Sequence, residues 1–415
     1  MRLSTLQSYN KGLDSILNNQ REVNKTQQQV STGLRVLTPS DDPIAATKIL
    51  QLQQDQALRD QFGKNMTGAE GRLNLEETQL ASITDNLIRV RELTIQAGDG
   101  AYSKTDRQAI GSELKQLLAS TVNLMNSKDA GGEHLFGGFK GSKEPFQKNS
   151  DGRYEYQGDE GQRFIAIASS TTVATGDNGK RLFVDIKAAD NTFTAHSSPL
   201  NKGNAVISPG LVVDDEKYAE FYPEDLIITF NPEAAMPPPN LPEANYTVRQ
   251  ASDGRVVEGL ENIPYSNNQQ ITVAGVSVNI NGNPEPGDEF LIDSSEKQSI
   301  TDTMYRLMDG LNRLENNPDD AETLDNLLAS TLQNLEFAEA SISQVRSELG
   351  ARLNIIENTA SQAADIDIVS KSVLSELRDV DFAEAVSRLS LQTFLLETAQ
   401  QSYAKIQNLS LFNKI

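Results

Sequence analysis

Residues 324–356 read LDNLLASTLQNLEFAEASISQVRSELGARLNII, and this stretch decides the fold of the chain. Apolar side chains recur every seven residues from Leu328 through Leu349 to Ile356, and a second series lies between them. An alternation by three and four residues is typical of an α-helix that packs along one stripe. At about 1.5 Å per residue, the pattern predicts a helix roughly 60 Å long that starts after Asn317-Pro318.

The same periodicity marks both ends of the chain. Residues 4–37 carry two interleaved seven-residue series, diluted by Gln20 and Gln27. Asp42 is expected to cap a second helix whose first residue is Pro43, because proline lacks only an N–H that has no partner there. We expect the two terminal helices to pair along a seam formed by Leu6, Tyr9, Leu13, Ile16, Val23, Val30, Phe382, Val386, Leu389, Leu396 and Tyr403.

The last helix has more apolar faces than one partner helix can cover. The surplus residues lie on other azimuths than the seam, and they are Leu391, Phe394, Leu395, Ile406, Leu409, Leu411 and Phe412. In one interpretation, these residues are buried inside a helical bundle formed by this chain alone. The other reading, which we favour, has neighbouring molecules bury them.

The middle of the chain changes character. From about residue 154 to 292 the apolar residues have period two and are often β-branched, as in residues 164–167, 182–186, 226–230 and 271–278. Such runs predict strands, and Asn-Gly and Asp-Gly pairs between them predict turns. The order is therefore helices, strands, helices. Periodicity alone leaves open whether the strands form a domain inserted into a helical rod or one of three consecutive domains.

Two capping boxes are predicted at helix starts, one from Ser4 with Gln7 and one from Thr105 with Gln108. In such a box a hydroxyl side chain and an acidic or amide side chain satisfy the first free backbone N–H groups of a helix.

Composition excludes several classes of function. The 415 residues include no Cys and no Trp, so disulfides, thiol nucleophiles and Cys-based metal sites are absent. The formal net charge is −21, which disfavours binding of nucleic acid and is otherwise a source of solubility. No stretch approaches 18 consecutive apolar residues, and the start lacks the apolar core of a signal peptide, so no membrane partner is expected.

No catalytic or cofactor motif is present. The two histidines, His134 and His196, have no H-E-x-x-H context, and the phosphate-binding and nucleophile-elbow patterns are missing. The pairs Asp365 with Asp367 and Asp379 with Asp381 could bind hard cations, but carboxylates at helix ends are favourable without any metal. We therefore expect the protein to have no enzymatic activity and to bind no metal and no cofactor.

Several local stretches resemble the flagellin superfamily. Residues 29–43 (QVSTGLRVLTPSDDP), 135–139 (LFGGF), 349–354 (LGARLN), 378–383 (RDVDFA) and 402–413 (SYAKIQNLSLFN) carry the resemblance. Together with the first residues, MRLST, they are similar to the hook-associated junction proteins of this superfamily rather than to flagellins.

The resemblance implies an α+β multidomain fold in which both chain ends form a discontinuous helical coiled-coil rod with an inserted β-rich domain. It implies a terminal coiled-coil domain of residues 1–42 with 366–415, a helical rod of 43–141 with 295–365, and an insert of 142–294.

Partners and location follow from the same resemblance. It implies a ring of copies of this chain between hook-associated protein 1 and flagellin, in the flagellum outside the cell. Secretion would use the flagellar type III system, with an export chaperone on the C-terminal helices.

Two other functions stay open. The chain could be a flagellin-type subunit that forms the filament itself, or the β insert could be an adhesin or binding module.

Overall fold

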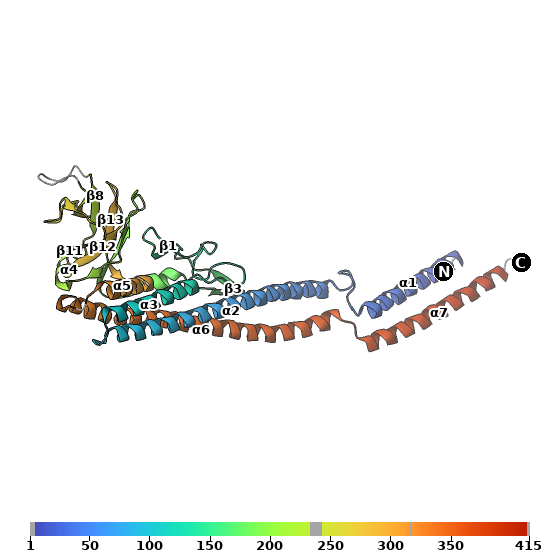
Figure 1. The fold of residues 1–415 in the computed structure, drawn as a ribbon. Helices are drawn as coiled ribbons and strands as arrows, with labels where there is room; N and C mark the ends of the chain where they lie inside the picture. The colour runs from blue at the N-terminus through green and yellow to red at the C-terminus, as the bar shows by residue number, and fades with distance from the viewer. Residues whose placement is uncertain (1–4, 233–242, 316, 413–415) are drawn as a thin grey trace. The chain divides into compact units, whose positions relative to one another are not determined.

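The computed structural model describes residues 5–232, 243–315 and 317–412, and the chain forms two compact units (Figure 1). The terminal unit combines Met1–Asn65 with Glu357–Ile415, and the central unit is Met66–Ile356. Helices at both chain ends and strands between them confirm the predicted fold class. The predicted division into three domains stays a prediction.

The helices follow the predicted periodicity. In chain order they are α1 (Thr5–Thr32), α2 (Pro43–Ala97), α3 (Lys104–Met125), α4 (Asp215–Phe221), α5 (Ile300–Arg313), α6 (Pro318–Arg378) and α7 (Phe382–Phe412). The seven-residue series of α6 from Leu328 to Ile356 is buried, as is the stripe of α2 from Leu73 to Val90. The long central stripe was therefore predictable from spacing alone.

Helix starts test the local predictions. The Asp42 Oδ1 accepts the Ala45 N–H at 3.0 Å, which confirms Asp42 as the cap of α2. The box predicted at Thr105 and Gln108 is wrong by two residues, because Ser103 caps α3 instead. The Asp106 carboxylate accepts the Ser103 N–H at 2.9 Å, so aspartate takes the place expected for glutamine. Ser4 lies outside the described residues.

The strands of the central unit form two larger sheets and two hairpins. One sheet has the order β10-β9-β8-β13-β5, the other has β11-β12-β6 with β7 also paired to β12, and β1-β2 and β3-β4 are the hairpins. The strands are β1 (Phe146–Lys148), β2 (Tyr154–Tyr156), β3 (Phe164–Ala168), β4 (Thr171–Ala174), β5 (Lys187–Ser197), β6 (Val206–Ile207), β7 (Leu211–Val212), β8 (Leu226–Asn231), β9 (Asn245–Gln250), β10 (Ile263–Pro264), β11 (Gln269–Val273), β12 (Val276–Asn281) and β13 (Glu289–Lys297). The two larger sheets share one apolar core that includes Phe193, Phe230 and Phe290.

Two of the predicted strands differ from the structure. Residues 182–186 were expected to be extended, but Lys180–Val184 form one turn of π-helix, η1. Both Leu182 and Phe183 are buried, and a helical turn can bury two adjacent side chains where a strand would expose one. Residues 271–278 form two strands, because Ala274 and Gly275 adopt positive φ and turn the chain.

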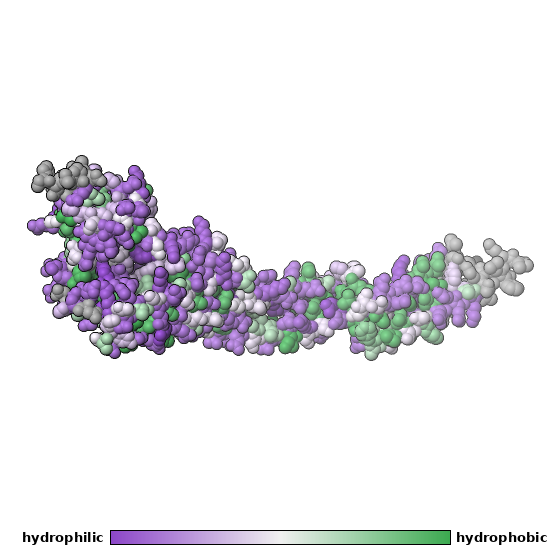
Figure 2. Space-filling view, viewed as in Figure 1, coloured by the Kyte–Doolittle hydropathy of each residue, from purple (hydrophilic) through white to green (hydrophobic). Residues whose placement is uncertain are grey.

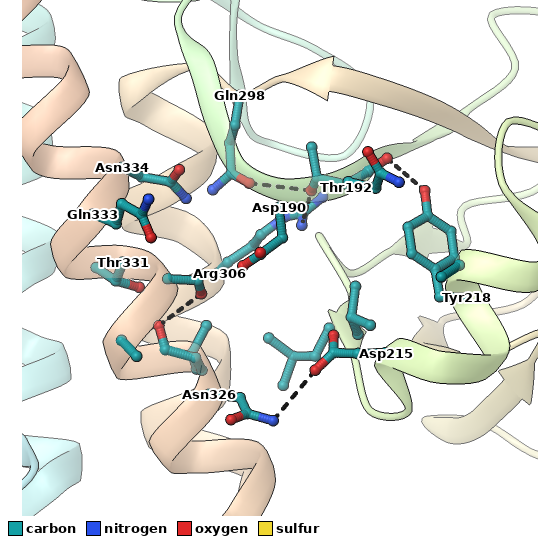
Figure 3. A pocket seen from close by; sticks show the side chains of 17 residues that line it. Asp190, Thr192, Asp215, Tyr218, Gln298, Arg306, Asn326, Thr331, Gln333 and Asn334 are labelled. Atoms are coloured by element: carbon teal, nitrogen blue, oxygen red, sulfur yellow. Dashed lines mark hydrogen bonds between the residues drawn. The ribbon is translucent and has the colours of Figure 1, made fainter.

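A cavity of about 410 Å³ lies among β5, α4 and α6 of the central unit (Figure 3). Arg306 in its wall is buried, donates to the Thr192 hydroxyl at 2.6 Å and lies 4.5 Å from the centre of the Phe193 ring. Burial lowers the pKa of Arg306 to about 10. Tyr218 donates to the Thr192 carbonyl. These side chains serve to hold β5 against its helical neighbours.

Candidate assembly surfaces of the terminal unit

Helices α1 and α7 lie side by side in the terminal unit and run antiparallel. At one end Gly12 meets the Tyr403 ring, where an added Cβ would lie 3.1 Å from Cδ2. At the other end Gly33 faces the Phe382 ring. The pairing of the two chain ends is thus a property of the single chain.

The interior of this pair mixes apolar residues with small and polar ones. The least exposed positions alternate by three and four along each helix. On α1 they include Gly12, Ile16, Asn19, Val23, Thr26, Gln29 and Val30, and on α7 they include Ala385, Leu389, Gln392, Leu396, Ala399 and Tyr403. Small and amide side chains bury little apolar area, so the pair gains less hydrophobic stabilisation from its own contact than a seam of leucines would give.

The larger apolar residues of α7 lie on its outside. Leu391 is 59 % exposed, Phe394 is 63 % exposed and Leu395 is 48 % exposed. Figure 2 shows hydrophobic surface gathered over α7, whereas the visible face of the central unit is mostly hydrophilic. Monomers rarely expose large contiguous apolar surface unless a partner covers it.

The residues predicted for the seam, together with the apolar residues predicted for intermolecular packing at the end of α7, divide into three groups. Leu389, Leu396 and Tyr403 of α7, and Ile16, Val23 and Val30 of α1, lie along the paired faces. Leu13, Phe382 and Val386 are 39 %, 56 % and 49 % exposed. The side chains of Leu6, Tyr9, Ile406, Leu409, Leu411 and Phe412 lie outside the described part of the chain. The assembly roles of all these residues stay predictions.

The predicted seam lacks the small and polar residues that also lie along the paired faces. Gly12, Asn19 and Thr26 also recur every seven residues, as do Ala385, Gln392 and Ala399. A search for small residues at this spacing would have found the inner faces.

The rest of the terminal unit has the same pattern. Facing positions of α2 and α6 include Gln56, Arg59, Asp367 and Ser370, all only partly exposed. Large apolar residues lie outside, and they are Ile44, Leu50 and Leu58 on α2 with Ile366, Ile368, Val369 and Val373 on α6. The whole unit therefore has polar and apolar groups mixed on its inner faces and a surplus of large apolar groups outside.

A short joint connects the two helix pairs, formed by residues 33–42 with 377–381. Arg35 N–H donates to the Arg378 carbonyl at 2.7 Å, and Val380 N–H donates to the Gly33 carbonyl at 2.9 Å. Gly33 has φ +73°, which lets α1 end with a left-handed residue. The structure thus brings together two of the quoted motifs, residues 29–43 and 378–383.

Gln29 links the joint to both terminal helices. Its side chain is buried, donates to the Arg35 carbonyl at 2.6 Å and accepts from Arg388 of α7 at 3.2 Å. Buried amides with satisfied hydrogen bonds fix geometry more than they add stability. The joint therefore sets the direction in which α1 and α7 leave it.

Three of the acidic side chains named as possible cation ligands have partners within the chain. Asp381 caps α7 through the Ala383 N–H at 2.9 Å, and Asp379 binds Arg378 at 2.8 Å. Asp367 pairs with Lys371 at 2.6 Å. Among the described residues no group of three potential ligands could hold a metal ion.

The Asp41 carboxylate makes the stability of the joint depend on pH. The Lys25 ammonium, 2.8 Å away, and the Thr38 N–H lower the pKa of Asp41 to about 2. A carboxylate with a lowered pKa stabilises the folded form above about pH 4, and this contribution is lost as the pH falls towards 2.

We therefore expect Asp41→Asn to speed amide exchange of residues 33–42 several-fold at pH 7, measured by hydrogen-exchange mass spectrometry. Wild-type protein should show the same loosening only near pH 2. Asp14→Asn, on the exposed side of α1, is the matched control and should change neither profile. Equal exchange in Asp41→Asn and wild type at pH 7 would refute this role of Asp41.

Charge is distributed unequally between the units. Residues 1–65 and 357–415 carry 13 basic and 14 acidic side chains, whereas residues 66–356 carry 24 basic and 44 acidic ones. The terminal unit is therefore close to neutral, and nearly all the net charge of the chain lies in the central unit. No helix in the described ranges combines the length and apolar character needed to cross a bilayer.

Two family models match the chain. The bacterial flagellin N-terminal helical region matches residues 3–140, and the bacterial flagellin C-terminal helical region matches residues 332–413. Both regions contain the helices that form the terminal unit.

Full-length relatives agree with the family models. Flagellar hook-associated protein 3 of Salmonella typhimurium is 25 % identical over 412 residues, which is 99 % of each chain. The crystal structure of flagellar hook-associated protein 3 from Legionella pneumophila is 29 % identical with a TM-score of 0.52, covering 79 % of this chain and 98 % of that one. A structure of the flagellar junction protein FlgL from Legionella pneumophila is 28 % identical with a TM-score of 0.50, covering 80 % and 99 %.

These matches extend from the first helix to the last, and the exposed apolar helices of the terminal unit lie inside the regions that the flagellin models cover. The chain therefore belongs to the flagellin superfamily and, within it, to the family of flagellar hook-associated protein 3.

Proposed function

We propose that this flagellar hook-associated protein is the structural adaptor that joins hook to filament as a ring of copies. The observation that carries the proposal is the surplus of large apolar residues outside the paired faces, with Leu391, Phe394 and Leu395 exposed on α7. Such helices leave most of their hydrophobic stabilisation to contacts with other molecules. The protein's relatives are structural components of the flagellum, and no catalytic step is needed.

The charge distribution supports neighbours that pack through the terminal unit. Like-charged surfaces repel at short range, but a unit with 13 basic and 14 acidic groups carries almost no net charge. The central units, with their excess of 20 acidic groups, would repel each other and stay on the solvent side. This arrangement favours one mode of contact between copies.

The partners we propose are further copies of this chain, hook-associated protein 1 on the hook side and flagellin on the filament side. An export chaperone would cover the apolar face of α7 before secretion through the flagellar type III channel. The absence of cysteine suits a chain that unfolds for export and refolds outside the cell without oxidation. Nucleic acid and membranes are not among the proposed partners.

The test is deletion of residues 382–415. Cells that express only the truncated chain should secrete or accumulate a folded central unit but carry no attached filaments, as counted by electron microscopy. Normal filament attachment would refute the proposal. When pure wild-type protein is added to flagellar seeds, growth of the seeds should stop after a short addition. Growth into continuous filaments would indicate a flagellin instead.

A further inference from the structure

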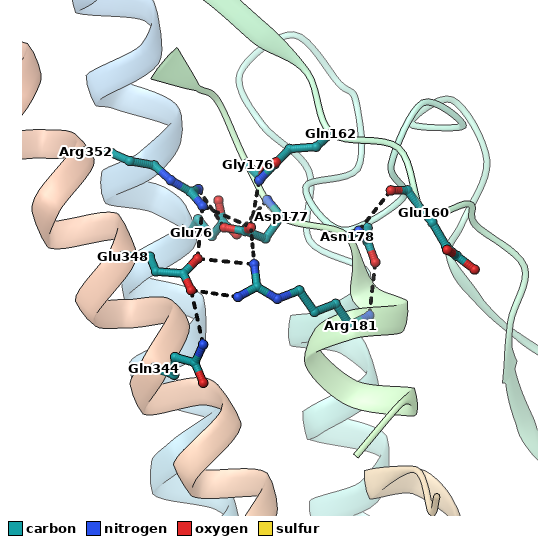
Figure 4. A network of polar contacts seen from close by, with 10 residues as sticks. All are labelled: Glu76, Glu160, Gln162, Gly176, Asp177, Asn178, Arg181, Gln344, Glu348 and Arg352. Atoms are coloured by element: carbon teal, nitrogen blue, oxygen red, sulfur yellow. Dashed lines mark hydrogen bonds and ion pairs between the residues drawn. The ribbon is translucent and has the colours of Figure 1, made fainter. Parts of the chain in front are cut away.

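A buried polar cluster joins α2 and α6 to the strap, which we define as residues 174–186, from the last residue of β4 to the residue before β5 (Figure 4). Asp177 of the strap has a side chain that is 1 % exposed and accepts two bonds from Arg352 of α6, at 2.7 and 3.2 Å. Arg181 of the strap binds Glu348 of α6 at 2.7 Å. The charged members of this latch cluster are Arg72, Glu76, Asp129, Asp177, Arg181, Glu348 and Arg352.

Glu76 of α2 is the one carboxyl in the latch cluster without an ion pair. It is fully buried, and its Oε1 accepts the backbone N–H of Asp177 at 3.1 Å. Its Oε2 is buried and has no hydrogen-bond partner among the described residues. An ionised carboxylate in such a place lacks the donors that would replace water, so the neutral acid is favoured.

The charges of the latch cluster balance without Glu76. Arg72 pairs with Asp129, Arg352 with Asp177, and Arg181 with Glu348. The charged groups that face Glu76 are Arg72 on its own helix, Asp177 on the strap and Arg352 on α6. Because both arginines already have carboxylate partners, an ionised Glu76 would add an unbalanced negative charge. Burial and the neighbouring Asp177 charge raise the pKa of Glu76 to about 8.

The strap is the point where this cluster meets the β structure. Its Gly179 N–H donates to the Phe136 carbonyl at 2.8 Å, and its Phe183 packs edge-on against Phe136 and Phe146. β5, which pairs with β13 in the five-stranded sheet, begins directly after the strap. Release of the strap would therefore loosen the link between the helices and this sheet.

We propose that Glu76 is a proton-dependent latch, which holds the strap against α2 and α6 while its carboxyl is protonated and releases it when the proton is lost. The closed form binds the proton more tightly than the open form, in which Glu76 would regain the ordinary pKa of 4.5. Opening of the strap must then become easier as the pH rises from about 5 to about 8, and become independent of pH above that.

Hydrogen-exchange mass spectrometry between pH 5 and 9 tests the latch on the full chain. Exchange in peptides that cover residues 174–186 is first corrected for intrinsic exchange rates. The equilibrium constant for opening of the strap should then rise roughly tenfold per pH unit up to about pH 8. Glu76→Gln keeps the bond from the Asp177 N–H but cannot ionise, so its profile should be flat. Glu77→Gln is the matched control on the next residue of α2, where Glu77 pairs with Arg346 near the surface, and should behave as wild type.

A flat wild-type profile would overturn the latch, and so would an equal slope in Glu76→Gln. Asp177→Asn provides a second variant, because removing the neighbouring negative charge lowers the pKa of Glu76 in the closed form. Its profile should level off at a lower pH than that of wild type. An unchanged profile in Asp177→Asn would also count against the proposal.

Discussion

A chain with Leu391→Lys and Leu395→Lys is expected to fold as wild type does and to fail in assembly. Both side chains lie on the outer face of α7, 59 % and 48 % exposed, so replacing them should change the stability of the single chain little. Burying one leucine contributes about 1.5–3 kcal/mol. Losing two of them at each contact between copies, and placing two charges there, should lower the association constant more than a hundredfold. Filament attachment in cells and sedimentation of the purified protein are the measurements.

The chain offers a matched control for these lysines. Leu200 of the central unit is 88 % exposed, more than either leucine of α7. Leu200→Lys makes the same chemical change away from the terminal unit, so filaments should attach normally. If Leu200→Lys and the α7 variant were equally harmful, surface hydrophobicity in general would be responsible and the assigned role of α7 would be wrong. Normal attachment in both would refute it as well.

The second large effect concerns stability of the central unit. Arg352→Ala should lower its free energy of unfolding by roughly 3–5 kcal/mol, because the buried Asp177 carboxylate then loses its main counter-charge. Asp177 would keep Gln162 at 2.9 Å and the more distant Arg181 at 3.6 Å. Urea unfolding followed by tyrosine near-UV circular dichroism is the measurement, since most tyrosines lie in this unit.

Arg346→Ala is the control on the same helix. Arg346 also connects α6 to α2, by a 2.7 Å pair with Glu77, but both side chains are about one-third exposed. Exposed pairs contribute at most about 1 kcal/mol. Arg352→Ala should therefore lower the free energy of unfolding several times more than Arg346→Ala does. Equal costs would mean that the buried pair contributes no more than a surface pair.

Spacing along the chain predicted the helices well and their inner faces less well. The stripe from Leu328 to Ile356 is large and regular, so burial of leucine and isoleucine settled it. In α1 and α7 the same rule chose Leu13 and Phe382, which are half exposed. The same rule also chose Ile16, Val23 and Leu396, which lie on the paired faces. It fails at the other positions because large apolar residues also cover the outside of these helices.

Local chemistry was predictable where it depends on neighbours in sequence. Asp42 caps α2 as expected, because a cap needs only its own next turn. The strand expected at residues 182–186 is a π-helical turn, because Phe136 and Phe146 from distant segments receive Phe183. No local pattern contains that information.

Four features could be read directly from the residues: the helical periods, the break between Thr32 and Pro43, the lack of cysteine and the acidic excess. These features depend on residues a few positions apart or on composition, and short-range sterics and hydrophobicity are enough to establish them. Only the tertiary structure decided which stripe of α7 faces α1, that Arg352 neutralises Asp177, and that Glu76 is left without a counter-ion. Those outcomes join residues up to several hundred positions apart, and burial makes their charges matter only after the chain has brought them together.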